Sequence, residues 1–310
     1  MEHFDVLCIG ELNVDLILTG LKQMPKVDTE IIAKNSFLTL GSSTAIFGCG
    51  VSKLGLKTSF LGKVGNDDFG TKCIDSLKEK GIHTSNIIID KNIDTGITVA
   101  LGYNNDRALV TALGSIDKLT VQDIDFSIIE KAKHIHIGSF FLQSGLRSDL
   151  VKLFKFAKER GITTSLDSGW DETNCWDYEI FEVLKYTDIF FPNENEAINI
   201  AKTKDITSAI NKISKYVHTL VVKMGAKGCI VVENKQEYIG NAFNVQEVVD
   251  TTGAGDSFNA GYIYGFLNKK SIEECMAYAS ACGSICVQNV GGIQGCPSLE
   301  DVEKFLVERK

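Results

Sequence analysis

Short apolar segments and amphipathic helical patterns alternate along this chain from one end to the other. Apolar residues at helical spacing between 150 and 157 end at Gly161, and an apolar run at 162–166 follows directly. Because a helix between two strands brings those strands side by side and parallel, repeated units of this kind predict a parallel sheet with helices on both faces. We therefore expect an α/β fold with three layers, Rossmann-like, around a mostly parallel sheet. Strands are expected at 6–10, 135–138, 162–166, 189–191, 220–223 and 229–232, and a further helix at 73–81.

Two stretches, 14–38 and 96–111, interrupt this alternation because they carry strand patterns without an intervening helix. In the second stretch, two β-rich runs flank a turn at Asn104-Asn105-Asp106, which predicts a hairpin. Such strands fit a small separate sheet that covers a cleft as a lid. No long linker, repeat or low-complexity segment divides the chain, so we expect residues 1–310 to form one domain that carries this lid.

Residues 250–256 read Asp-Thr-Thr-Gly-Ala-Gly-Asp and connect a predicted extended run, 245–249, to a helical pattern that begins at Ser257. The two glycines let the backbone turn sharply and approach a ligand, and the start of a helix offers unpaired N–H groups and a positive dipole end. These features predict an anion-binding turn formed by Gly253, Ala254, Gly255 and Asp256. The carboxylate of Asp256 is suited to accept a proton from a hydroxyl that attacks the bound phosphate. A purely structural turn with an aspartate cap is the alternative.

Charge and apolar content exclude several classes of partner. The formal net charge is -8 without a run of Lys or Arg, which argues against nucleic-acid binding, and no segment approaches the roughly 18 to 20 apolar residues that span a membrane. The N-terminus lacks the basic region of a signal peptide, and the nine cysteines are an odd number without a Cys-x-x-Cys pair. We expect reduced thiols, a cytoplasmic location and small metabolites as partners.

The residues give less support to a metal site, a dinucleotide-binding turn or a second kind of phosphate loop. His134 and His136 would share one face of a strand, but no third metal ligand lies nearby, so core positions are expected. After the first strand, residues 10–13 lack the Gly-x-Gly-x-x-Gly turn of dinucleotide-binding proteins, and a Gly-x4-Gly-Lys-Ser/Thr phosphate loop is absent too. Phosphate binding is therefore expected at 253–256.

The string 250–256, followed by Ala260-Gly261, resembles the C-terminal signature of the ribokinase-like (PfkB) carbohydrate kinases. Further strings resemble the family in the same order along the chain: an opening motif at 10–15, a glycine turn and first long helix at 41–55, and a third string at 62–70. The resemblance implies an ATP-dependent kinase that uses Mg²⁺ and transfers the γ-phosphoryl group to a hydroxyl of a sugar or sugar-like polyol. In this reaction Asp256 is the base, and the turn at 253–256 holds the developing negative charge.

The resemblance places the acceptor contacts in the N-terminal part of the chain. Asp15 would accept hydrogen bonds from sugar hydroxyls, and Asn13 is a weaker candidate for the same surface. Gly41 and Ser42 would form the turn beside the acceptor, although Ser42 stands where a second glycine is usual. Ile46 stands where an asparagine commonly contacts the acceptor, so this pocket departs from the family pattern.

The resemblance also implies nucleotide and cation contacts in the C-terminal half. Asn193 and Glu196 match an Asn-x-x-Glu motif in which Glu196 holds Mg²⁺ through water, while a helix cap is the alternative role of Asn193. Residues that would bind the nucleotide are Lys223, Gly225, Gly228 and Ser280. Asp250 and Thr252 match positions that hold a monovalent cation, K⁺, together with carbonyls from 288–292.

Two alternative functions stay open at this point. A nucleoside kinase of the same fold would suit the apolar Ile46 and Phe47, which equally suit a helix core. A catalytically inactive sugar-binding regulator belongs to another class of protein, and the intact turn at 253–256 argues against it.

The lid has two expected functions of its own. Arg107, at the tip of the 96–111 hairpin, is expected to reach the substrate or a neighbouring subunit. The exposed edges of a small sheet need covering, so we expect a homodimer that forms through the lid.

Overall fold

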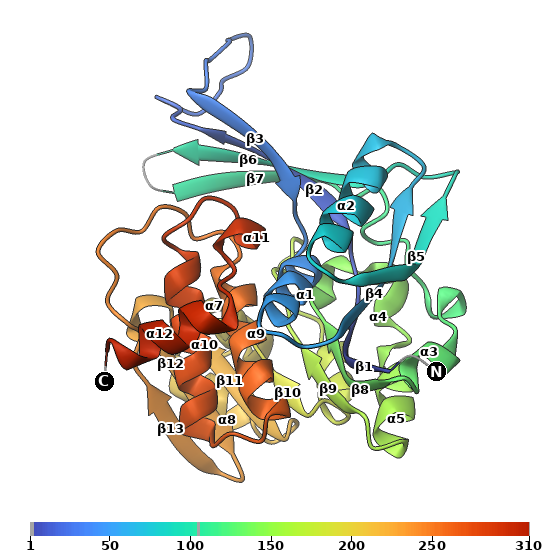
Figure 1. Ribbon diagram of the computed structural model, residues 1–310, viewed down its shortest axis with the longest axis vertical. Helices are drawn as coiled ribbons and strands as arrows, with labels where there is room; N and C mark the ends of the chain where they lie inside the picture. The colour runs from blue at the N-terminus through green and yellow to red at the C-terminus, as the bar shows by residue number, and fades with distance from the viewer. Residues whose placement is uncertain (1–2, 104–105, 310) are drawn as a thin grey trace.

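Nine strands form the main sheet in the computed structural model, which describes residues 3–103 and 106–309. They are β1 (Phe4–Ile9), β4 (Thr58–Gly65), β5 (His83–Asp90), β8 (Ala132–Ile137), β9 (Thr163–Leu166), β10 (Ile189–Phe190), β11 (Thr219–Lys223), β12 (Cys229–Glu233) and β13 (Gln236–Gly240). Their order across the sheet is β13-β12-β11-β10-β9-β8-β1-β4-β5 (Figure 1). Neighbouring strands run parallel from β5 to β11, while β12 and β13 extend one edge antiparallel. The predicted mostly parallel sheet is confirmed.

Helices cover both faces of this sheet, because successive side chains of a strand point to opposite sides. In β1, Val6 and Cys8 belong to one hydrophobic core and Leu7 and Ile9 to the other. The first core is covered by α1 (Ser43–Lys53), α2 (Asp68–Glu79), α9 (Ala254–Leu267), α10 (Ile272–Cys286), α11 (Gly292–Gly295) and α12 (Leu299–Val307). The second core is covered by α3 (Phe126–Ile129), α4 (Ser144–Arg147), α5 (Leu150–Glu159), α6 (Glu179–Leu184), α7 (Glu194–Ala201) and α8 (Ile206–Ile213). Short 3-10 turns are η1 (Val121–Asp123), η2 (Phe140–Leu142) and η3 (Gly225–Lys227). The predicted three-layer α/β fold is therefore confirmed.

A separate four-stranded sheet projects from one end of the molecule (Figure 1). Its strands are β2 (Asn13–Thr19), β3 (Asn35–Leu40), β6 (Gly96–Tyr103) and β7 (Asp106–Ala112), in the order β3-β2-β6-β7. The small sheet of the predicted fold class is thus present, and both predicted stretches contribute to it. Asn104 and Asn105 of the predicted turn lie outside the described residues. One domain over 1–310 stays a prediction.

The segment before the glycine turn differs from the expectation. Residues 241–250 form no strand, so the predicted extended run at 245–249 belongs to neither sheet. Its apolar residues lack a partner strand, and Val248 and Val249 remain 58% and 48% exposed. The following helix begins at Ala254, three residues before the predicted start at Ser257. Sequence periodicity missed this first turn because its residues are small or acidic and provide no apolar spacing.

The two histidines occupy the core positions that were expected of them, and eight of the nine cysteines are buried. His134 hydrogen-bonds Thr163 and Ser165 at 2.8 Å, and His136 stacks on Phe47 with ring centroids 3.6 Å apart. Burial lowers the pKa of both imidazoles to about 3 and so keeps them neutral. All nine cysteines are free thiols, and Cys175 alone among them is exposed. Among residues 3–103 and 106–309, no three ligating side chains gather at a metal site, and no helix is long and apolar enough to cross a membrane.

The contact between α9 and α10 leads to a stability prediction. A Cβ added at Gly261 would lie 2.6 Å from the Tyr278 carbonyl and 2.8 Å from Ala279 Cα, both of which are backbone atoms. Gly261→Ala should therefore push the helices apart and lower the free energy of unfolding by about 1 to 3 kcal/mol. Gly283→Ala is the matched control on α10, because its new Cβ meets its nearest neighbour at 3.4 Å. Urea unfolding of both variants checks this, and equal stabilities would contradict it.

Candidate functional site

The turn at the start of α9 requires glycine for steric reasons. Gly253 caps the helix with φ of 74°, a conformation that L-residues with a side chain rarely adopt. A Cβ at this position would also lie 2.5 Å from Gly292 Cα and 3.0 Å from the side chain of Ile46. The backbone at the start of α9 therefore packs directly against Gly292 and the Ile46 side chain. The first-turn N–H groups of a helix have no partner within the helix, so they can bind an anion.

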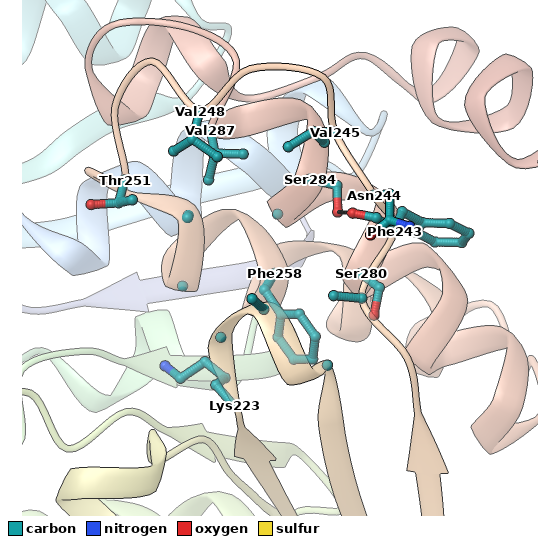
Figure 2. A pocket seen from close by; sticks show the side chains of 17 residues that line it. Lys223, Phe243, Asn244, Val245, Val248, Thr251, Phe258, Ser280, Ser284 and Val287 are labelled. Carbon is teal, nitrogen blue, oxygen red and sulfur yellow. Dashed lines mark hydrogen bonds between the residues drawn. The ribbon is translucent and has the colours of Figure 1, made fainter. Parts of the chain in front are cut away.

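A cavity of about 500 Å³ opens at this turn (Figure 2). It brings together Lys223, Gly225, Gly228, Gly255 and Ser280, all singled out from the sequence. Figure 2 shows Val245, Val248 and Val287 on one side of the cavity and Lys223 on the other, with Phe258 between them. Val245 and Val248 were missed as site residues, although the apolar run at 245–249 was the signal that could have found them.

A buried group of polar side chains lies directly behind the cavity. Asp167, immediately after β9, accepts hydrogen bonds from Lys223 Nζ at 2.6 Å, Asn259 Nδ2 at 2.8 Å and Gly169 N at 2.9 Å. Burial alone would raise the pKa of Asp167, but Lys223 holds that pKa below its usual value. Sequence reasoning missed both Asp167 and Asn259. The signal for Asp167 was its place after an apolar strand, because ligand sites of parallel sheets form at the carboxyl ends of strands.

Glu196 and Asn193 cap the first turn of α7 reciprocally. Glu196 N donates to Asn193 Oδ1 at 2.9 Å, and Asn193 N donates to Glu196 Oε2 at 2.8 Å. Ser168 Oγ donates to the same Oε2 at 2.9 Å, so this carboxylate lies beside Asp167. Burial and the charge of Asp167 raise the pKa of Glu196 to about 7. The capping role that was the alternative for Asn193 is present.

Asp256 lies in the first turn of α9 within the influence of the same charges. Burial and the negative charge of Asp167 raise the pKa of Asp256 to about 8, against the opposing effects of Lys223 and of a hydrogen bond with Ser43. This carboxyl group therefore has a far higher proton affinity than an exposed aspartate.

Four of the predicted acceptor residues, Asn13, Asp15, Gly41 and Ser42, lie close together where β2 and α1 begin. Asn13 Nδ2 donates to Asp15 Oδ1 at 2.9 Å, and a Cβ at Gly41 would collide with both side chains. Ser42 adopts φ of 72°, caps α1 by accepting from Ala45 N at 3.0 Å, and donates to the Glu11 carbonyl at 2.7 Å. The segment from Gly41 to Ser43 thus connects the Asp15 side of the site to Asp256.

A buried carboxylate near the start of α1, that of Glu11, escaped the sequence analysis. Glu11, 3% exposed, accepts from Thr44 Oγ1 at 2.6 Å and from Gln143 Nε2 at 3.3 Å. Burial raises the pKa of Glu11. The signal in the sequence was the position of Glu11 directly after the first predicted strand.

Ile46 and Phe47 belong to the core. Ile46 is 4% exposed and packs against Gly253 and Gly292, and Phe47 is fully buried. Both side chains therefore have the helix-core packing that was one of the two interpretations of these positions.

Asp250, Thr252 and Arg107 complete the predicted residues. Asp250 Oδ1 accepts from Thr252 N at 2.8 Å and from its hydroxyl at 2.6 Å, and Asp250 Oδ2 accepts from Gly291 N at 2.9 Å. The pair thereby joins the loop before the turn to the predicted carbonyl-bearing loop at 288–292. The backbone of Arg107 pairs with Gly102 in the lid, and its side chain lies outside the described part of the chain.

Comparisons with known proteins agree on one family. Residues 3–299 match the family model described as pfkB family carbohydrate kinase. A protein named as an uncharacterized sugar kinase, from Archaeoglobus fulgidus, is 31% identical over 254 residues, which cover 81% of this chain and 100% of that protein. The structure of Arabidopsis thaliana ribokinase complexed with ribose and ATP gives a TM-score of 0.85 at 26% identity and 99% coverage of each chain. An E. coli protein assigned as a ribokinase II, in complex with ATP and Mg²⁺, gives 0.87 at 25% identity, with 99% of this chain and 100% of that chain covered.

The raised pKa of Asp256 predicts an effect on stability. The folded state holds a proton on Asp256 up to about pH 8, whereas the unfolded chain loses it near 3.8, so wild-type stability falls as pH rises between these values. Asp256→Asn should remove this loss and stabilise the protein at pH 9, relative to wild type, by on the order of 1 to 3 kcal/mol more than at pH 4. Denaturant unfolding at the two pH values measures the difference. A stability difference that does not change with pH would contradict the raised pKa.

Proposed function

Because this chain belongs to the pfkB family of carbohydrate kinases, we propose that it transfers the γ-phosphoryl group of ATP to a hydroxyl of a sugar or sugar-like polyol. One observation carries this proposal: Asp256 and the ammonium of Lys223 both lie at the glycine turn of α9, where the 500 Å³ cavity opens. A helix N-terminus with a lysine beside it suits phosphate, and a carboxyl group of high proton affinity suits an attacking hydroxyl.

In the proposed reaction, Asp256 accepts the hydroxyl proton as the acceptor oxygen attacks the γ-phosphorus. The new O–P bond forms while the bond to the β-phosphate oxygen breaks, and ADP leaves. Backbone N–H groups of Gly253, Ala254, Gly255 and Asp256 would stabilise the negative charge that develops on the transferred group. The raised pKa strengthens Asp256 as a base but requires that it be deprotonated first, so kcat/KM should rise with pH through the pKa of this group.

The cavity is proposed to hold the nucleotide. Its lining combines a polar end at Lys223, Gly225 and Gly228 with an apolar end at Val245 and Val287, as a nucleotide with phosphates and a flat base requires. Ser280 on α10 would contact the base. Support for ATP comes from the two similar structures that contain it.

A divalent cation fits the charge balance of the site. Asp167, Glu196 and Asp256 surround one lysine, Lys223, so carboxylates are in excess. When bound, Mg²⁺ would neutralise phosphate oxygens, and we propose that Glu196 holds it through water, with Asn193 orienting that carboxylate. We further propose that Asp250, Thr252 and carbonyls of 288–292 hold a monovalent cation beneath the turn, since oxygen ligands suit K⁺.

The acceptor is proposed to bind on the other side of the turn. Asp15 would accept hydrogen bonds from its hydroxyls, with Asn13 fixing the carboxylate at 2.9 Å. The backbone at Gly41 and Ser42 would approach the acceptor closely, and Arg107 would reach it from the lid.

A panel assay tests the function itself. ADP release is measured with pentoses, hexoses, sugar phosphates, inositols and nucleosides, each with K⁺ and with Na⁺ alone. Turnover with a sugar or polyol is expected, and turnover with nucleosides alone would replace the proposal with a nucleoside kinase. Tight sugar binding without turnover of any acceptor would favour an inactive sugar-binding regulator.

Substitution of the proposed base should remove most of the turnover. Asp256→Asn keeps the size of the side chain but cannot accept the proton, so kcat should fall on the order of 10² to 10⁴-fold. Glu300→Gln is the matched control, because Glu300 is also an acidic residue in the first turn of a helix, α12, and should retain wild-type turnover. Unchanged kcat in folded Asp256→Asn would contradict the role of the base.

The lid sheet carries an apolar row that supports the proposed homodimer. Leu38, Leu16, Val99 and Val110 pair in register across all four strands and so share one face. The two at the edges, Leu38 and Val110, are 42% and 61% exposed. We propose that this face packs against the same face of a second copy, which is the arrangement that a two-fold symmetric contact requires.

Sedimentation velocity at micromolar concentration tests the dimer. Wild type should sediment as a dimer and Val110→Lys as a monomer, because the lysine places a charge within the apolar contact. Leu109→Lys is the matched control on the opposite face of the same strand and should remain dimeric. A monomeric wild type would reject the proposal.

A further inference from the structure

We propose that Asp167 is a positioning residue, whose carboxylate holds the ammonium of Lys223 against the first turn of α9 so that this ammonium contacts a phosphoryl group of the bound nucleotide. The inference rests on the proposed function and adds a residue that lies outside every motif identified in the sequence.

The side chain of Lys223 runs along the glycine turn. A Cβ built at Gly255 would lie 3.5 Å from Nζ, 3.7 Å from Cδ and 3.9 Å from Cε of Lys223, which is ordinary packing distance. Lys223 ends β11, and its side chain, which lies at one side of the cavity (Figure 2), is only 15% exposed. Its ammonium therefore lies beside the backbone N–H groups that are proposed to hold the transferred phosphoryl group.

Asp167 is itself fixed by groups that do not move easily. Its Oδ2 accepts from Asn259 Nδ2 as well as from Lys223, and its Oδ1 accepts from Gly169 N. Asn259 is fully buried on α9, three residues after Asp256. α9 therefore carries the glycine turn and, through Asn259, also holds the carboxylate of Asp167. Because Asp167 binds Lys223, the turn and the lysine ammonium are fixed relative to one another.

Charge distribution explains why such an anchor is needed. Three carboxylates act on Lys223, those of Asp167, Glu196 and Asp256. A lysine has four rotatable side-chain bonds and three donor hydrogens, so without a fixed partner its ammonium would also pair with the proposed base. The bond to Asp167 uses one hydrogen and leaves two for phosphate oxygens. A buried ion pair by itself contributes little net stability, so positioning accounts for this pair better than stabilisation does.

Calorimetric titration with MgATP provides the test, because it needs no acceptor. Asp167→Asn should weaken MgATP binding on the order of tenfold, and Lys223→Met by at least as much. The double variant should bind no more weakly than Lys223→Met alone, since the anchor has no effect once the ammonium is gone. Asp171→Asn is the matched control: Asp171 is 4% exposed in the same loop and accepts from Thr173 and Trp176, so it should keep wild-type affinity.

Wild-type affinity in Asp167→Asn, or losses that simply add in the double variant, would overturn the positioning role. If Asp167→Asn does not fold by circular dichroism, Asn259→Ala decides, because it removes one donor to Asp167 and leaves the ion pair. That variant should bind MgATP several-fold more weakly, and only while Lys223 is present; wild-type affinity would overturn the role. A wild type that binds MgATP but phosphorylates no acceptor contradicts the proposed function alone, whereas one that binds no MgATP contradicts both proposals.

Discussion

The parallel direction of the strands from β5 to β11 is the constraint on which the site depends. The carboxyl ends of parallel strands lie at the same edge of the sheet, so the residues that directly follow these strands lie near one another. Glu11 after β1, Asp167 after β9 and Asn193 after β10 meet there, and Lys223 ends β11 beside them. The N-terminus of α9 then closes this edge with the glycine turn.

This arrangement concentrates charge that the fold must tolerate. Asp167, Glu196 and Asp256 share one lysine, and burial together with the negative charge of Asp167 raises the pKa of Glu196 and of Asp256. At high pH the folded protein is therefore less stable than it would be with uncharged side chains at these positions. Such strain is common where a group must hold a proton more tightly than it would in water.

How far the sequence predicts this protein depends on whether a feature is local. Gly253 and Gly255 were predictable because backbone conformation and helix start are set by neighbouring residues. The first turn of α9 was assigned three residues late because Ala254, Gly255 and Asp256 provide no apolar spacing. Asp167 and Asn259 were missed because their contacts join distant parts of the chain: Asp167 lies 56 residues from Lys223 and 92 residues from Asn259. No local pattern marks such contacts. Ile46 and Phe47 were ambiguous for the same reason, since only packing separates a core residue from a pocket wall.

By itself the sequence determined the alternation of strands and helices, the small separate sheet and the turn at 253–256, because periodicity and glycine act over a few residues. The tertiary structure alone decided which side chains share the buried charge. Lys223 can pair with Asp167 only after β9 and β11 are placed on either side of β10, and Asn259 can reach Asp167 only after α9 packs on the sheet. The segment at 245–249 illustrates the same division: its apolar character was local, but the absence of a partner strand left it as a wall of the cavity rather than as part of the sheet.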